Sequence, residues 1–193
     1  MAESLRTFIA IELDKKIKDY LRQIQNEIKK SDADVRWVNP DNIHLTLKFL
    51  GDTPVEKIDK IIQIMTREVR GLNPLSFTLT SLGCFPDTSK PRVIWMGITD
   101  PENQITVLAS SLAQALKQIG FKNEKLSFSP HITLGRVKSL KNAKLLSNYI
   151  KNYGLSHQEC FKQTLNHIAL IKSTLTQQGP HYEILRKLEA FIR

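Results

Sequence analysis

The chain has 193 residues, and 41% of them are hydrophobic, which suits one ordinary domain or two small lobes that share a core. It contains two cysteines, which excludes a framework of disulfides and argues against a zinc knuckle. Its 28 Lys and Arg against 19 Asp and Glu give a net charge of +9, so the surface favours polyanions or phosphorylated ligands, although a solvated basic surface gives the same balance.

An apolar run over residues 7–13 opens the chain and predicts a strand. Glu12 interrupts this run, so it predicts neither a signal peptide nor a membrane span. Cys84 and Cys160 form no C-x-x-C pair and are expected to be small buried residues. Together these features predict a cytoplasmic protein.

The first half continues as helix, strand and helix. Apolar residues at helical spacing predict a helix over residues 17–28, followed by an extended piece at 35–38 and a strand over 42–50. Thr53 has the features of a helix N-cap, because Pro54 occupies the first helical position after it.

We expect that helix to end at Gly71. An alternating segment over residues 75–80 then predicts a half-buried strand, and the segment 83–91, which contains Gly and two Pro, predicts a loop. The tail from Gly179 fits either a helix or a last strand, because its apolar residues satisfy both periodicities.

The order of elements starts again after this loop. The second round comprises a strand over 92–98, a helix from Asp100 to Gly120, a strand over 129–136, a shorter helix over 140–153 and a strand over 161–171. Residues 7–80 and 92–171 thus share one element order, which indicates an internal duplication. We expect one two-lobed domain over residues 1–193 with an α+β fold: two pseudo-symmetric lobes of mainly antiparallel sheet, helices on the outer faces and a cleft between the lobes.

Equivalent strands of the two halves carry the same pattern, His-x-Thr-x. It reads His44-Leu45-Thr46-Leu47 in the first half and His131-Ile132-Thr133-Leu134 in the second, 131 − 44 = 87 positions later. Side chains alternate between the faces of a strand, so each His shares a face with its Thr while the apolar residues point into a core. We expect the polar faces to line the cleft.

Two facing histidines suit displacement at phosphorus. Imidazole, with an ordinary pKa of about 6.5, both takes and gives a proton near neutral pH. One ring takes a proton from an incoming water while the other protonates the leaving oxygen, and the threonine hydroxyls donate hydrogen bonds to the phosphoryl oxygens. This scheme needs no metal. His157, His167 and His181 lack a threonine at that spacing, so we expect surface or structural roles for them.

The two motifs resemble the paired motifs of the 2H phosphoesterases, in particular the bacterial and archaeal RNA 2′,3′-cyclic phosphodiesterase family called LigT or ThpR. The similarity extends over nearly the whole chain and includes residues 6–11, 42–51, 92–95 and 129–136. It implies hydrolysis of a 2′,3′-cyclic phosphate at an RNA end to a 2′-phosphate, without a metal or another cofactor. It also implies RNA 3′ ends or small cyclic-phosphate nucleotides as ligands, and the self-contained halves favour a monomer.

The resemblance implies that His44 donates a proton to the leaving 3′ oxygen and that His131 accepts one from water. Thr46 and Thr133 would hold the phosphate. The residues themselves leave open which histidine is the acid and which the base.

Several residues around the motifs are ambiguous from sequence. Arg136 matches the family's arginine after the second motif, but strict alternation turns it away from His131, so a role with the nucleotide requires a bulge or strand end near Gly135. By the same alternation Phe49 points into the core, and stacking on a base is the second interpretation. Arg92 fits a phosphate contact or a surface position equally well. Lys48, Lys90 and Lys138 are expected to extend a basic rim, and Trp37 and Trp95 to lie in the core.

Three rival functions remain at this level. The reverse reaction, joining RNA ends through a 2′-5′ linkage, uses the same residues. A non-catalytic RNA-binding module is disfavoured because both His-Thr pairs are intact and aromatic residues make up only 7% of the chain. A metallohydrolase is disfavoured because neither motif contains Asp or Glu and no H-E-x-x-H pattern occurs.

Overall fold

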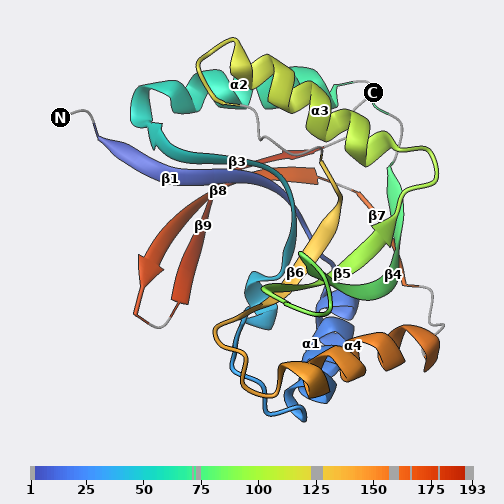
Figure 1. The fold of residues 1–193 in the computed structure, drawn as a ribbon. Helices are drawn as coiled ribbons and strands as arrows, with labels where there is room; N and C mark the ends of the chain where they lie inside the picture. The colour runs from blue at the N-terminus through green and yellow to red at the C-terminus, as the bar shows by residue number, and fades with distance from the viewer. Residues whose placement is uncertain are drawn as a thin grey trace.

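The computed structural model describes residues 3–70, 72, 75–122, 128–156, 161–165, 167–177 and 179–189. Within these ranges, nine strands join in one antiparallel sheet that is accompanied by four α-helices (Figure 1). The elements are β1 Ser4–Glu12, α1 Lys15–Lys29, β2 Val35–Trp37, β3 His44–Pro54, α2 Ile58–Val69, β4 Ser76–Phe85, β5 Val93–Thr99, α3 Gln104–Lys117, β6 His131–Val137, α4 Ala143–Ser156, β7 Lys162–Thr164, β8 His167–Thr176 and β9 Gly179–Glu189. Short 3-10 turns at Pro40–Asn42 and Val55–Lys57 precede β3 and α2.

The strand order is symmetric about one junction. The strands run β7-β4-β5-β6-β3-β1-β8-β9, with β2 paired to β6 beside this path. β6 and β3 meet in the middle through the register pair Leu45–Ile132. One lobe contains β3, β1, β8 and β9, and the other contains β6, β5, β4 and β7. Each lobe therefore takes one long strand from the other half of the chain, because β4 joins the second lobe and β8 joins the first.

The helices lie in two pairs on the outer faces of the two lobes. α2 and α3 pack together over the β3–β1 lobe, whereas α1 and α4 lie together on the other side, where α4 packs on β4 (Figure 1). This arrangement confirms the expected α+β fold with pseudo-symmetric lobes and outer helices.

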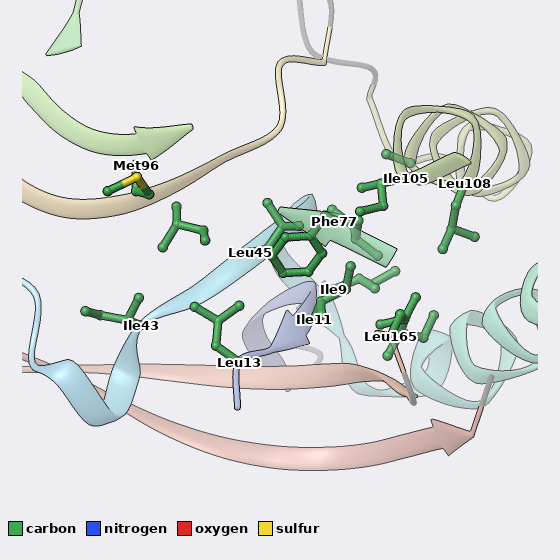
Figure 2. Close-up of a cluster of buried hydrophobic side chains, with 14 of the residues drawn as sticks. Ile9, Ile11, Leu13, Ile43, Leu45, Phe77, Met96, Ile105, Leu108 and Leu165 are labelled. Carbon is green, nitrogen blue, oxygen red and sulfur yellow. The ribbon is translucent and has the colours of Figure 1, made fainter. Parts of the chain in front are cut away.

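A hydrophobic core joins the helices to the sheet. The apolar residues of both motifs belong to it, since Leu45 and Ile132 are fully buried. Figure 2 shows Leu45 beside Phe77 of β4, close to Ile9 and Ile11 of β1. Each such side chain contributes about 1.5–3 kcal/mol on burial. The core therefore fixes which face of each motif strand is left for the polar residues.

The predicted start of the second helix was wrong. Thr53 and Pro54 end β3, and α2 begins at Ile58 after a 3-10 turn. The Thr53 hydroxyl is buried and lies 2.7 Å from the Thr7 hydroxyl on β1, so a tertiary hydrogen bond takes the place of the expected N-cap. Gly71, the expected end of this helix, lies outside the described residues.

Two strand predictions also needed correction. β4 continues to Phe85, into the predicted loop, and Gly83 lies under the Trp95 ring, where a Cβ would come within 2.3 Å of the indole. The predicted strand over 161–171 is two strands in different lobes, since β7 pairs with β4 and β8 pairs with β1. The tail forms strand β9, so its helical interpretation was wrong.

Candidate active site

Both motif strands turn His and Thr to the sheet face opposite the core. Continuing the antiparallel pair between β3 and β6 by one residue in each direction places His44 opposite Thr133 and Thr46 opposite His131. All four side chains are partly exposed, whereas the alternating residues are buried. The structure thus brings the two His-Thr pairs together at the junction of the lobes.

The same hydrogen bond orients both imidazole rings. His44 Nδ1 lies 2.7 Å from the carbonyl oxygen of Asn42, and His131 Nδ1 lies 2.7 Å from that of Ser129. A carbonyl oxygen only accepts, so Nδ1 carries the hydrogen in each ring. The other nitrogen, Nε2, then holds a lone pair and can accept a proton.

Aromatic rings surround His44. Phe8 stacks on the imidazole with ring centroids 4.7 Å apart, and Tyr182 of β9 approaches edge-on at 5.4 Å. Burial lowers the pKa of His44 to about 4, opposed by the hydrogen bond to Asn42 and helped by the positive charge of Lys18. His44 is therefore neutral at pH 7 in the ligand-free protein.

His131 has different aromatic neighbours. Phe85 approaches it edge-on at 5.0 Å, and the ring centroid of Trp95 lies 6.4 Å away. Trp95 pairs with Thr133 in the β5–β6 register and so lies on the polar face, which contradicts its expected place in the core. Its Nε1 is buried and has no hydrogen-bond partner among the described residues. Trp37, in contrast, packs against the core as expected.

A bulge in each motif strand reverses which face of the sheet the following residues point to. Along β1, Ala10 pairs with Thr46 but Ile9 pairs with Lys48, so Leu47 is skipped. Phe49 then pairs with Phe8 and shares the face of His44.

β6 repeats this device. Along β5, Trp95 pairs with Thr133 but Ile94 pairs with Gly135, so Leu134 is skipped. Arg136 then pairs with Val93, on the face of β5 that carries Trp95, and shares the face of His131. The bulge that the role of Arg136 required is present.

The β6 bulge is held from the core side. The carbonyl oxygen of Leu134 accepts hydrogen bonds from the backbone N–H of Val38 at 2.9 Å and from Gln25 Nε2 at 2.9 Å. Gln25 lies on α1, is fully buried, and also donates to the carbonyl oxygen of Val38 at 2.8 Å. The sequence did not single out Gln25; a lone polar residue on the apolar face of α1 was the available signal.

Positive charge gathers beside Tyr182. Burial raises the pKa of Tyr182, and the charges of Arg136 and Arg6 act in the opposite direction. Both arginines are exposed, and within the described residues neither forms an ion pair with a carboxylate. Arg136 therefore lies near the ring that packs on His44.

The β8–β9 hairpin is tied to the first motif. Asn42 Nδ2 donates a hydrogen bond to the carbonyl oxygen of Pro180 at 3.0 Å. The same Asn42 supplies the carbonyl that orients His44. The hairpin that carries Tyr182 is thus anchored at the residue that sets the tautomer of the first histidine.

Two predictions for the residues after the first motif were wrong. Phe49 is 54% exposed, with its ring centroid 6.0 Å from that of Phe8, so it is not a core residue. Lys48 is buried and donates to the carbonyl oxygen of Lys122 at 3.0 Å, so it does not extend a basic rim. The available signal was spacing, since Phe49 follows His44 by the same five residues by which Arg136 follows its histidine.

The remaining sequence-predicted cations lie at the surface. Lys90, Lys138 and Arg92 are exposed, so their contact with RNA stays a prediction. Among the other histidines, His167 Nε2 lies 2.7 Å from Glu12 Oε2, which also pairs with Lys187 at 2.6 Å. His181 is exposed. His157 and Cys160 lie outside the described residues, and Cys84 is buried as expected.

No described helix is long and apolar enough to cross a membrane. In the same described ranges, no group of three His, Cys, Asp or Glu side chains is arranged to hold a metal ion.

The fold and the paired motifs place the protein in the two-histidine class of phosphoesterases. The sequence model described as LigT like phosphoesterase matches the chain twice, over residues 11–95 and 98–182, and each match contains one His-x-Thr strand. The chain therefore belongs to the LigT-like phosphoesterase family.

The similarity to known relatives extends over nearly the full chain. The RNA 2′,3′-cyclic phosphodiesterase of Methanothermobacter thermautotrophicus is 34% identical over 178 residues, which cover 92% of this chain and 95% of the relative. That of Aquifex aeolicus is 34% identical over 185 residues, 95% of this chain and 96% of the relative. Among solved structures, TT0787 of Thermus thermophilus has a TM-score of 0.79 at 24% identity, covering 96% of this chain and 98% of that one. E. coli LigT complexed with 3′-AMP has a TM-score of 0.76 at 23% identity, with 97% and 98% covered. The two structural likenesses confirm the fold.

Proposed function

We propose that the protein hydrolyses the 2′,3′-cyclic phosphate at RNA ends to a 2′-phosphate without a metal ion. The observation that carries this proposal is the pair of facing His-Thr strands, in which each imidazole is held through Nδ1 and keeps Nε2 for proton exchange. The relatives named RNA 2′,3′-cyclic phosphodiesterase support the same chemistry.

In this reaction the oxygen of a water molecule attacks phosphorus and the bond from phosphorus to the 3′ oxygen breaks. His131 Nε2 takes the proton that the water loses, and His44 Nε2 gives a proton to the 3′ oxygen. The Thr46 and Thr133 hydroxyls donate hydrogen bonds to the non-bridging oxygens, where negative charge is greatest in the transition state. Arg136 adds a fixed positive charge on the same face.

The protonation of His44 depends on the ligand. With a pKa of about 4 it is neutral at pH 7 in the free protein, so it has no proton to give from Nε2. A cyclic phosphate brings a negative charge against the ring, and a nearby opposite charge favours the protonated imidazole. Substrate binding thus favours the protonated form of His44, which is the acid that the leaving oxygen requires.

Phe49 fits the base of the terminal nucleotide. Its ring is 54% exposed and rests against Phe8, which in turn stacks on His44. An exposed aromatic face beside a phosphate site is a stacking surface that accepts any base. This replaces the core role expected from sequence.

The ligands in this proposal are RNA 3′ ends or small cyclic-phosphate nucleotides. The protein acts as one two-lobed domain, because each lobe contains a long strand from the other half of the same chain, so the halves are not self-contained as the sequence suggested. We propose that this domain acts as a monomer. We further propose a cytoplasmic location, which the low cysteine count of the chain favours.

The deciding experiment incubates the purified protein, in EDTA, with a short RNA that ends in a 2′,3′-cyclic phosphate. A 2′-phosphate product is expected, lost in His44→Ala and in His131→Ala but kept in His181→Ala, which removes an exposed histidine. A 3′-phosphate product, dependence on added metal, or activity in the double variant would contradict the proposal. Joined RNA in place of a monoester would indicate the ligation reaction, and RNA binding without product a non-catalytic module.

A further inference from the structure

A second arginine lies beside Arg136. β2 pairs with β6 in the register Val35–Val137, Arg36–Arg136 and Trp37–Gly135. Directly opposite residues of antiparallel strands project to the same face. Because Val35 and Trp37 pack against the core, Arg36 shares the outer face with Arg136.

Arg36 also approaches the β8–β9 hairpin. Its Nη2 lies 3.7 Å from the position that a Cβ on Gly179 would occupy. The neighbouring Pro180 is bound by Asn42, and Tyr182 follows two residues later in the same strand. The Arg36 guanidinium therefore lies between β6 and the hairpin, next to the candidate active site.

Arg36, Arg136 and Arg6 form a cluster of positive charge that no described carboxylate neutralises. Arg6, Arg36 and Arg136 are exposed, and none has a carboxylate at ion-pair distance among the described residues, whereas Arg22 and Arg67 are paired with Asp19 and Glu68. Like charges directly opposite each other in a sheet repel. An anion bound between the arginines would relieve this repulsion. Because there are three such arginines, the cluster is suited to more than one phosphate.

The reacting phosphate does not need this second arginine. A cyclic phosphodiester carries one negative charge and two non-bridging oxygens, and the proposed mechanism already supplies two threonine hydroxyls and Arg136 to them. Arg36 lies one strand away, at a spacing of about 4.8 Å between neighbouring strands, within side-chain reach of a different phosphate of the same nucleic acid.

We propose that Arg36 binds the phosphodiester immediately upstream of the reacting cyclic phosphate. The preferred substrate is then an oligonucleotide end and not a mononucleotide. This inference rests on the proposed function and deepens it by naming the substrate class.

The test compares two substrates, adenosine 2′,3′-cyclic phosphate and a dinucleotide with the same cyclic end and one upstream phosphodiester. Removal of one charged phosphate contact in Arg36→Gln is expected to lower kcat/KM for the dinucleotide about 10- to 100-fold, mainly through KM, because a hydrogen bond to a charged group contributes about 1.5–3 kcal/mol and each 1.4 kcal/mol is tenfold. The slope of log(kcat/KM) against log(salt) should fall by about one on the dinucleotide alone. The mononucleotide should be hydrolysed at the wild-type rate. Arg36→Lys, which keeps the charge, should retain part of the preference.

Arg67→Gln is the control, because it also removes an exposed arginine, here from α2, and should change neither substrate. Equal losses on both substrates would overturn the proposal and assign Arg36 to the reacting phosphate, and wild-type activity of Arg36→Gln on the dinucleotide would overturn it as well. If the wild type hydrolyses neither substrate, the proposed function fails. The affinities of Arg36→Gln and wild type for the two corresponding 2′-phosphate products, measured by calorimetry, then still decide the role of Arg36.

Discussion

The two motif strands share a backbone design but differ in their surroundings. In both, Nδ1 of the histidine is held by a carbonyl two residues earlier, and a bulge turns the fifth following residue to the active face. In β3, however, the ring is packed between Phe8 and Tyr182 and the fifth residue is Phe49. In β6 the fifth residue is Arg136. Duplicated geometry thus presents two equivalently held imidazoles, and their neighbours make them chemically different.

The largest expected effect is the loss of kcat on removal of either histidine, and a change of leaving group distinguishes the role of one histidine from that of the other. Each of His44→Ala and His131→Ala should lower kcat about 10²–10⁴-fold on the natural cyclic phosphate. With sulfur in place of the 3′ oxygen, the leaving group needs less protonation, because a thiol has a pKa of about 8.5. His44→Ala should then recover most of its loss while His131→Ala stays slow, as measured by single-turnover kinetics. Recovery of His131→Ala in its place would exchange the two roles.

The burial of His44 predicts acid sensitivity. The pKa of His44 is about 4 in the folded protein and about 6.5 in the unfolded chain, so between these pH values the unfolded chain binds the extra proton. The stability that this group contributes is complete above pH 6.5 and is lost as pH falls toward 4. Urea unfolding should show that wild type loses about 3 kcal/mol more than His44→Asn between pH 7 and pH 4. Equal losses in the two proteins would refute the burial effect.

Arg136 and Phe49 occupy equivalent positions, and their removal should affect different kinetic constants. Arg136→Gln should lower kcat about 100-fold, since it removes a charge aimed at the transition state. Arg136→Lys, measured beside it, should restore part of kcat. A loss confined to KM would place Arg136 on the ground-state ligand only.

Phe49→Leu should raise KM about tenfold with little change in kcat, because stacking on a base is worth about 1–3 kcal/mol. Val107→Ala on α3 is the control, since that side chain is also exposed, at 62%, but lies on a helix. An unchanged KM for RNA ends of every base would remove Phe49 from the substrate site.

The smallest expected effect concerns the bulge in β6. Gln25→Leu removes the side-chain donor to the carbonyl oxygens of Leu134 and Val38 and should cost about 1–3 kcal/mol of unfolding free energy. Because the bulge aims Arg136, kcat should fall severalfold at a temperature where the variant is folded, with Arg136→Gln adding less loss than it does in wild type. Gln23→Leu, an exposed change on the same helix, should alter neither quantity.

The sequence predicted the features that depend on alternation and repetition. The His-x-Thr pairs, their common face and the two-lobed α+β fold all follow from period-two patterning and from the repeated element order. It failed where tertiary contacts override local pattern. Thr53 has the local features of an N-cap, yet its hydroxyl pairs with Thr7 across the sheet. Bulges leave no mark in the hydrophobic pattern, so the directions of Phe49 and Lys48 were reversed.

The exchange of long strands between the lobes has a consequence for how the chain is made. On the ribosome, β1 and β3 emerge early, but β8, which pairs with β1, emerges only after β4, β5, β6 and β7. β1, which pairs with the His44 strand β3, therefore keeps its other edge unpaired until β8 is made. The lobe around His131 has all four of its strands, β4 to β7, before that point. Vectorial synthesis thus completes the surroundings of His131 before those of His44, the reverse of their order in the sequence. A chain cut between β4 and β5 would have to reassociate from fragments before either lobe was whole.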